Sequence, residues 1–141
     1  MKTTKVLLYE MNWPTAKDYF IKNDIAIIPV GSNEQHGPSN PLGTDYLIAK
    51  SIAEETATRT GVLCLPVIPF GVSAHHKQFW GTISISPSIF KEYVKAVCLS
   101  LMYYGVQKIV IASPLFITFS CALEPNICTK TIIKTGSELQ I

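Results

Sequence analysis

The chain has 141 residues, of which 48% are hydrophobic and 16% are charged, and its net charge is +2. This length and apolar content indicate one folded domain with a real core, spanning 1–141, and exclude an intrinsically disordered protein. The single arginine, Arg59, and the lack of a basic cluster argue against nucleic-acid binding.

The first predicted elements are a strand at 6–9 and a helix that begins at Trp13-Pro14, because proline suits the first helical turn. A buried strand is expected at 25–30, where an uninterrupted apolar run ends at Gly31. The next predicted helix covers 45–60, with Thr44 as its N-cap. Its expected buried face consists of Leu47, Ile48, Ile52 and Ala53.

Three more elements follow. A strand at 62–68 contains Pro66, which makes it an edge strand or an irregular one. A helix is expected from Ser86-Pro87 to about Tyr104, and a strand at 108–112. The apolar stripe of that helix is Phe90, Val94, Val97, Cys98 and Leu101.

The predicted order is therefore βαβαβαβ, which is typical of a mainly parallel sheet with helices on both faces. We expect the α/β class, with a three-layer α/β/α architecture. Functional sites in such sheets lie at the carboxyl ends of the strands. Both long loops, 31–44 and 69–86, leave carboxyl ends.

Neither secretion nor membrane insertion is indicated. The apolar part of the first ten residues is too short for a signal peptide. The longest uncharged run, between Lys108 and Glu124, is too short to span a bilayer. The four scattered cysteines form no C-x-x-C pair and suit a reducing compartment. We expect a soluble, cytoplasmic protein with no membrane partner.

The loop after residue 30 carries three side chains of the metal-ligating type, Glu34, His36 and Asp45. Glu34 and His36 are two residues apart, so an extended backbone points them to the same side. The glycines and prolines between His36 and Asp45 make the chain turn back toward that pair. Two carboxylates and an imidazole suit Zn, Mn or Fe(II). The alternative is a loop histidine with ordinary hydrogen bonds, because the E-x-H pattern is common.

The second loop is rich in aromatic and polar residues. One interpretation makes it the wall of a substrate pocket, formed by Ser73, His76, Phe79 and Trp80. Ser73 would hydrogen-bond the substrate, and the aromatic rings would stack on a flat amide. The alternative is a surface loop whose aromatic side chains pack on a neighbouring subunit.

Two motifs resemble a known family. The segments 31–38 (GSNEQHGP) and 41–45 (PLGTD), followed by 69–87 (PFGVSAHHKQFWGTISISP), are similar to the signature of the creatininase (creatinine amidohydrolase) family. The resemblance covers about residues 5–112. It implies a two-metal amidohydrolase that cleaves a C–N bond in a small amide, such as creatinine or a formamide. It also implies a homo-oligomer, commonly a hexamer. In the family, the positions of Glu34 and His36 each bind one ion, and that of Asp45 bridges both.

The chain departs from the family pattern after residue 112. The family continues with a glycine-rich loop that supplies a further histidine ligand, whereas Ser113-Pro114 follows here and no histidine occurs after His76. Pro114–Leu123 would then be the helix that normally follows the missing loop. Ser39, His75 and Trp80 also replace residues usual in the family. The resemblance therefore implies a creatininase-like domain that is incomplete at its C-terminus.

No residue can be assigned to the general acid or to the last metal ligand. Glu124 and Glu138 are candidates by default, with a solvated surface role as the alternative. Residues 129–141 have weak patterning, with a possible strand fragment at 131–133. A second hypothesis is therefore a truncated, catalytically inactive relative that acts through subunit association.

Overall fold

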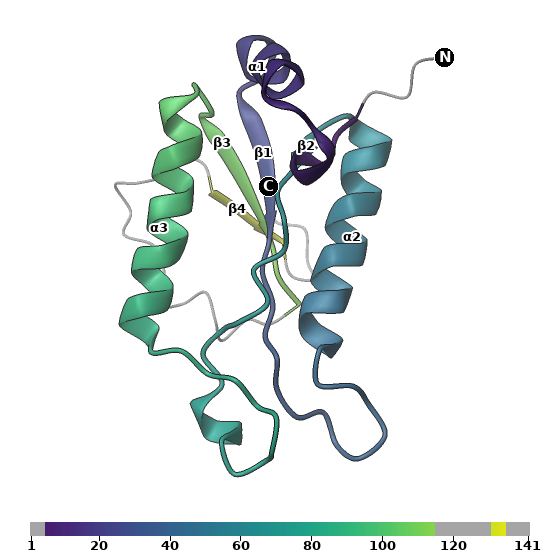
Figure 1. Cartoon of the computed structure of the whole chain (residues 1–141), viewed down its shortest axis with the longest axis vertical. Coiled ribbons are helices and arrows are strands. Elements are labelled where there is room, and N and C mark those ends of the chain that lie inside the picture. Colours follow the sequence, from purple (N-terminus) through teal and green to yellow (C-terminus); the bar gives the residue numbers. More distant parts are fainter. Residues whose placement is uncertain (1–4, 115–130, 135–141) are drawn as a thin grey trace.

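A computed structural model describes residues 5–114 and 131–134 of the chain. Its centre is a parallel sheet with the strand order β2-β1-β3-β4 (Figure 1). The strands are β1 (Ile25–Pro29), β2 (Leu63–Cys64), β3 (Lys108–Ala112) and β4 (Thr131–Lys134). β1 and β3 pair in register over their whole length, from Ile25 opposite Lys108 to Pro29 opposite Ala112.

Three helices cover the two faces of this sheet. They are α1 (Trp13–Lys22), α2 (Thr44–Thr60) and α3 (Pro87–Tyr103), and Figure 1 shows α2 and α3 on opposite sides of the strands. Alternate residues of β1 divide between the two layers: Ile28 packs in the cluster that includes α3, and Ile27 in the cluster that includes α2. The expected three-layer α/β/α fold with a parallel sheet is confirmed.

The prediction for α3 is also confirmed. Pro87 occupies the first turn, and the Ser86 hydroxyl accepts a hydrogen bond from the backbone N–H of Ile89, which caps the helix. Phe90, Val94 and Cys98 are buried at helical spacing, as is Leu101 one turn on. These side chains pack on β1 and β3 in the larger of the two core clusters.

The prediction for the buried face of α2 is confirmed for Ala53 and wrong for the other three residues. Leu47, Ile48 and Ile52 are 46%, 42% and 58% exposed. The buried stripe instead runs at four-residue spacing through Asp45, Ala49, Ala53 and Ala57. Small alanine side chains let α2 lie close to the sheet, which a row of leucine and isoleucine would prevent. Because Asp45 is the first member of this stripe, its carboxylate faces inward.

The start of α2 differs from the prediction in a second way. The helix begins at Thr44, and the position before it is Gly43, which has no side chain to cap the helix. The Thr44 hydroxyl donates to the backbone carbonyl of Pro41 at 2.6 Å instead of capping the helix. Thr44 therefore closes the preceding turn.

Two predicted strands are shorter than expected. The strand at 6–9 is reduced to a single parallel bridge between Leu7 and Cys64, because the 3-10 helix η1 (Leu8–Glu10) follows at once. The strand at 62–68 pairs only at Leu63–Cys64, with one further bridge at Ile68. Pro66 has no N–H to donate, which interrupts the ladder between them.

Part of the C-terminal prediction falls on described residues. The strand fragment expected at 131–133 is observed as β4, which pairs with β3. The predicted helix at 114–123 lies beyond the described residues apart from Pro114, and Glu124 and Glu138 lie outside them as well. Over the described part of the chain, no helix is long and apolar enough to cross a membrane.

Burial of Cys64 on β2 leads to a prediction about reactivity. Desolvation, with a smaller contribution from the Glu54 carboxylate, raises the pKa of the Cys64 thiol from 9.0 to about 12. Near neutral pH the thiol therefore stays protonated in the folded chain, and thiolate at pH 8 is about a thousandfold scarcer than in the unfolded chain. We expect iodoacetamide to label Cys64 slowly in buffer and rapidly in urea, as followed by peptide mass spectrometry. Equal rates in the two solutions would contradict this burial.

Candidate metal centre

The loop between β1 and α2 is held in a close contact with the start of α2. A Cβ atom placed on Gly31 would lie 2.4 Å from the Cα of Tyr46 and 2.8 Å from the carbonyl carbon of Asp45. Only glycine allows this approach. The backbone N–H of Glu34 donates to the carbonyl of Leu42 at 2.9 Å, which closes the loop on itself. The segment after the strand and the first turn of the helix are thereby fixed against each other.

This arrangement brings together the three residues predicted as metal ligands. One ligand atom from each of Glu34, His36 and Asp45 lies within 4.8 Å of the other two. Glu34 is 5% exposed and Asp45 is 4% exposed. Asp45 lies in the first turn of α2, where the helix dipole favours a carboxylate.

The contact between His36 and Asp45 bears on whether a metal ion would fit. His36 Nε2 lies 3.1 Å from Asp45 Oδ2, yet this buried nitrogen makes no hydrogen bond. The two atoms are close, but the orientation of the imidazole ring does not suit a hydrogen bond between them. A divalent ion bound by both would separate them by about 3.4 Å in tetrahedral geometry. A buried nitrogen without a hydrogen bond, beside two carboxylates, fits an ion between these side chains.

Ser32 is a further part of the site that the sequence analysis missed. This residue is 1% exposed, and its hydroxyl donates to Asp45 Oδ2 at 2.6 Å. Hydrogen bonds of this kind orient the carboxylates that ligate metal ions. Serine next to the strand-ending Gly31 gave no signal of this role, because the contact depends on the fold bringing α2 back to residue 32.

The electrostatics of the site also favour a cation. The ion-pair partners of Asp45 and Glu34 are His36 and His76, which carry a positive charge only when protonated. Two buried carboxylates in one site repel each other and lose their hydration. A bound divalent cation would offset both costs.

The second long loop lies against the first. Asn33 and Ile83 form an antiparallel bridge, and the backbone N–H of Gln35 donates to the Thr82 hydroxyl at 3.2 Å. This pairing brings His75 and His76 near Glu34, and one ligand atom from each of these three residues lies within 4.8 Å of the others. His75 was not among the predicted site residues.

The four residues predicted to line a substrate pocket lie in different environments. Ser73 is fully buried, and its hydroxyl oxygen has no hydrogen-bond partner. His76 is half-buried beside Glu34, and the Phe79 ring lies 6.3 Å from the His76 ring, centroid to centroid. Trp80 is 98% exposed. The loop thus places His76 and Phe79 together, with Trp80 projecting into solvent.

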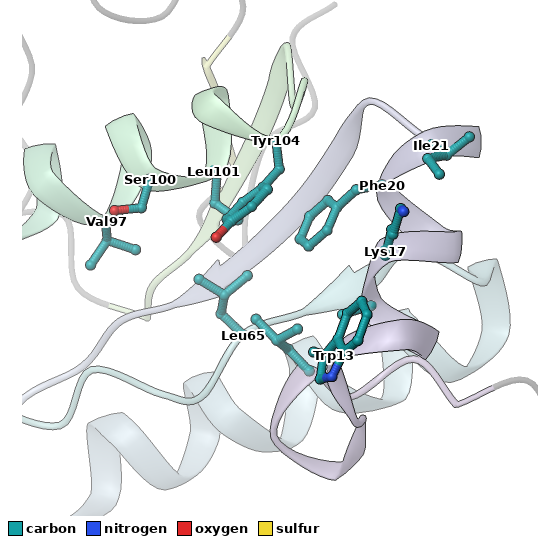
Figure 2. Close-up of a pocket in the computed structure, with 11 residues that line it drawn as sticks. Trp13, Lys17, Phe20, Ile21, Leu65, Val97, Ser100, Leu101 and Tyr104 are labelled. Atoms are coloured by element: carbon teal, nitrogen blue, oxygen red, sulfur yellow. The ribbon is translucent and has the colours of Figure 1, made fainter.

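A separate cavity lies at the opposite end of the sheet, between α1 and α3 (Figure 2). Its volume is about 670 Å³, and its lining includes Trp13, Phe20, Leu65 and Tyr104. The Phe20 and Tyr104 rings stack with their centroids 5.3 Å apart. Lys17 is the charged residue among its lining side chains. This apolar lining does not provide a set of metal ligands.

Comparison with known proteins assigns the chain to a family. The family model for creatininase, described as creatinine amidohydrolase, matches residues 9–113. The chain belongs to the creatininase family. The sequence resemblance carried by the two loops is therefore confirmed, and the family match covers both of them.

Relatives of several activities are similar to this creatininase-family chain. It is 31% identical over 108 residues to a 3-dehydro-scyllo-inosose hydrolase of Thermotoga maritima, which covers 76% of this chain and 35% of that protein. It is 40% identical over 88 residues to a mycofactocin precursor peptide peptidase of Mycobacterium ulcerans, covering 56% and 32%. It is 25% identical over 112 residues to the creatinine amidohydrolase of Pseudomonas putida, covering 75% and 43%.

Solved structures agree on the fold. A creatinine amidohydrolase (creatininase) crystal structure matches with a TM-score of 0.78 at 24% identity, covering 86% of this chain and 49% of that one. A mutant creatininase of the Zn-Zn type matches with a TM-score of 0.71 at 25% identity, covering 76% and 44%. The chain thus spans less than half the length of each of these relatives and structures.

Proposed function

We propose that this chain carries the metal-binding part of a creatininase-family amidohydrolase, which hydrolyses a C–N bond in a small amide. The observation that supports this most is the convergence of Glu34, His36 and Asp45. The residues of the site favour Zn, Mn or Fe(II) as the ion. Solved creatininases of the Mn and Zn-Zn types agree with a divalent metal as the cofactor.

Each residue of the site would have a separate role. Glu34, His36 and Asp45 would hold the ion, and Ser32 would orient the Asp45 carboxylate through its 2.6 Å hydrogen bond. A bound ion of this kind polarises an amide carbonyl and makes a water acidic enough to act as a nucleophile near neutral pH. His76 and Phe79, which the second loop places together, would contact the substrate, and Trp80 could reach it from its exposed position. Ser73 is fully buried and is not proposed as a direct contact. None of the described residues is assigned as the general acid.

The proposal also covers the class of substrate. A creatininase mutant complexed with creatine shows that a fold neighbour binds a small molecule. The relatives named above are a 3-dehydro-scyllo-inosose hydrolase, a mycofactocin precursor peptide peptidase and a creatinine amidohydrolase. A flat, small amide could stack on the Phe79 ring, which lies 6.3 Å from the His76 ring. We therefore propose a small-molecule amide as the substrate.

We also propose that the chain self-associates. Ile48 and Ile52 are exposed one turn apart on α2 and therefore share a face of that helix. Exposed apolar side chains that adjoin one another commonly mark protein interfaces. The expectation of a homo-oligomer rests on this surface and on the family resemblance, and multi-angle light scattering measures it directly.

The second candidate function is a non-catalytic relative that acts through association. It is favoured by Ser113-Pro114, which follow Ala112 where the family pattern continues with a glycine-rich loop that supplies a histidine ligand. A substrate panel separates the two functions. The metal-loaded chain is assayed with creatinine, small lactams, formamides and short peptides, beside Asp45→Ala. Turnover that is lost in Asp45→Ala supports the amidohydrolase, and no turnover with any substrate supports the non-catalytic relative.

A further inference from the structure

The cavity between α1 and α3 lies apart from the candidate metal centre and has the form of a small-molecule site. Its volume of about 670 Å³ falls within the roughly 300–1,000 Å³ of pockets that hold small ligands. Two buried side chains belong to its lining, Leu65 at 8% and Leu101 at 4% exposed. Figure 2 shows α1 side chains on one side of the cavity and α3 side chains on the other, with Leu65 between them. Because both helices contribute to the larger core cluster, these walls are held in place without a ligand.

Three aromatic side chains line the cavity from both sides. Trp13 and Phe20 lie on α1, and Tyr104 directly follows α3. The Phe20 and Tyr104 rings stack on each other, with 20° between their planes. Trp13 is 77% exposed, and none of the ring pairs among the described residues includes it. A flat aromatic ligand in the cavity would cover the open indole of Trp13, and contacts between aromatic rings are favourable beyond the area that they bury.

The polar side chains of the lining favour a negatively charged ligand. Lys17 is the charged residue among them, and it forms no ion pair with any residue that the structure describes. The ammonium of Lys17 and the indole N–H of Trp13 can only donate hydrogen bonds. The Ser100 hydroxyl already donates to the carbonyl of Ala96 at 2.9 Å. The described lining contains no carboxylate, so an anionic acceptor would meet a cation and a donor and no like charge.

We propose that this cavity binds a small aromatic carboxylate, with its ring between Trp13 and the apolar lining and its carboxylate at Lys17. Trp13 and Lys17 are four residues apart on α1 and share one face of that helix, so a compact ligand can reach both. The apolar side chains of Leu65 and Leu101 would receive the ring and exclude water from it. This proposal does not depend on the metal centre, because no residue of that centre lines the cavity.

Binding of 1-naphthaleneacetate to the metal-free full chain tests the proposal, with 1-naphthaleneacetamide as a neutral ligand of the same shape. We expect calorimetric titration at low salt to show about fivefold tighter binding of the acid, the upper end of what an exposed ion pair contributes. Lys17→Met should remove this preference and leave the affinity for the amide unchanged. Lys22→Met, in the last turn of the same helix and outside the lining, should keep the preference. Equal affinities of the wild type for the two ligands would overturn the proposal.

The indole N–H signals in nitrogen-15 spectra show where the ligand binds. The sequence has two tryptophans, Trp13 at the cavity and Trp80 on the second loop, and Trp80→Phe assigns their signals. We expect 1-naphthaleneacetate to shift the Trp13 signal and to leave that of Trp80 in place. A shift of Trp80 alone would put the ligand beside the candidate metal centre and overturn the proposal. A Trp13 signal that changes with protein concentration but not with ligand would overturn it too, because a second copy of the chain would then fill the cavity.

Discussion

Asp45→Asn is expected to lower the affinity of the chain for zinc or manganese by more than about 100-fold, which exceeds the usual effect of losing an outer-shell partner. The change removes the negative charge at the point where His36 and the first turn of α2 meet. Asparagine keeps the size of the side chain, so the buried alanine stripe that follows it can pack as before. Calorimetric titration with each metal measures the loss.

Stability separates loss of a ligand from loss of the fold. Without metal, we expect Asp45→Asn to change the free energy of unfolding by no more than about 1 kcal/mol, the usual size of a carboxylate's interaction with a helix N-terminus. Asp18→Asn makes the same chemical change on the exposed side of α1 and should leave metal binding unaltered. Metal affinity that is equal in Asp45→Asn and Asp18→Asn would show that Asp45 is not a ligand.

Gly31→Ala is expected to destabilise the chain and to weaken metal binding together. The added methyl group would lie 2.4–2.8 Å from backbone atoms of Asp45 and Tyr46, which cannot rotate away as a side chain can. The start of α2 must therefore move outward, at a cost of at least about 1–3 kcal/mol. The same movement takes Asp45 away from Glu34 and His36. Urea unfolding and metal titration measure the two effects.

A control for Gly31 lies at the other end of the same helix. Gly61 ends α2 with a φ of 74° and has no neighbour within 4 Å of an added Cβ. Gly61→Ala is thus expected to cost about 1–2 kcal/mol through backbone strain alone and to leave metal affinity unchanged. If Gly31→Ala destabilises the chain yet binds metal as tightly as Gly61→Ala, the close contact does not position the site.

The sequence was sufficient where local pattern and tertiary environment agree. The apolar run of 25–30, ended by Gly31, predicted a strand buried on both faces, and the predicted stripe of α3 matched its buried side. The family motifs and the alternation of strands and helices led to the fold class. In each case one local sequence pattern was present, and no second pattern predicted a different structure.

The buried face of α2 could not be predicted in this way, because its sequence offers two stripes. Hydrophobicity favours Leu47, Ile48 and Ile52, whereas the close approach of the helix to the sheet selects Ala49, Ala53 and Ala57. The spacing between helix and sheet is a tertiary property. It is set in part by the contact of Gly31 with the start of the helix, which no local pattern records.

The candidate site, too, could be predicted only in part from the sequence. Glu34 and His36 could be paired from alternation along an extended segment, and Asp45 from the turn that follows. His75 could not be placed near Glu34, because their proximity depends on the bridge between Asn33 and Ile83, far apart in the sequence. The hydrogen bond from Ser32 to Asp45 likewise depends on the fold.

X-ray absorption at the zinc edge, on the full chain loaded with one equivalent of zinc, tests the central claim most directly. The account predicts nitrogen and oxygen ligands at about 2.0–2.2 Å with the outer-shell scattering of imidazole, lost when Asp45 and His36 are both replaced. Sulfur ligands at about 2.3 Å would place the ion on cysteines, and a spectrum without imidazole would place it away from His36. Either result would contradict a metal centre built from Glu34, His36 and Asp45.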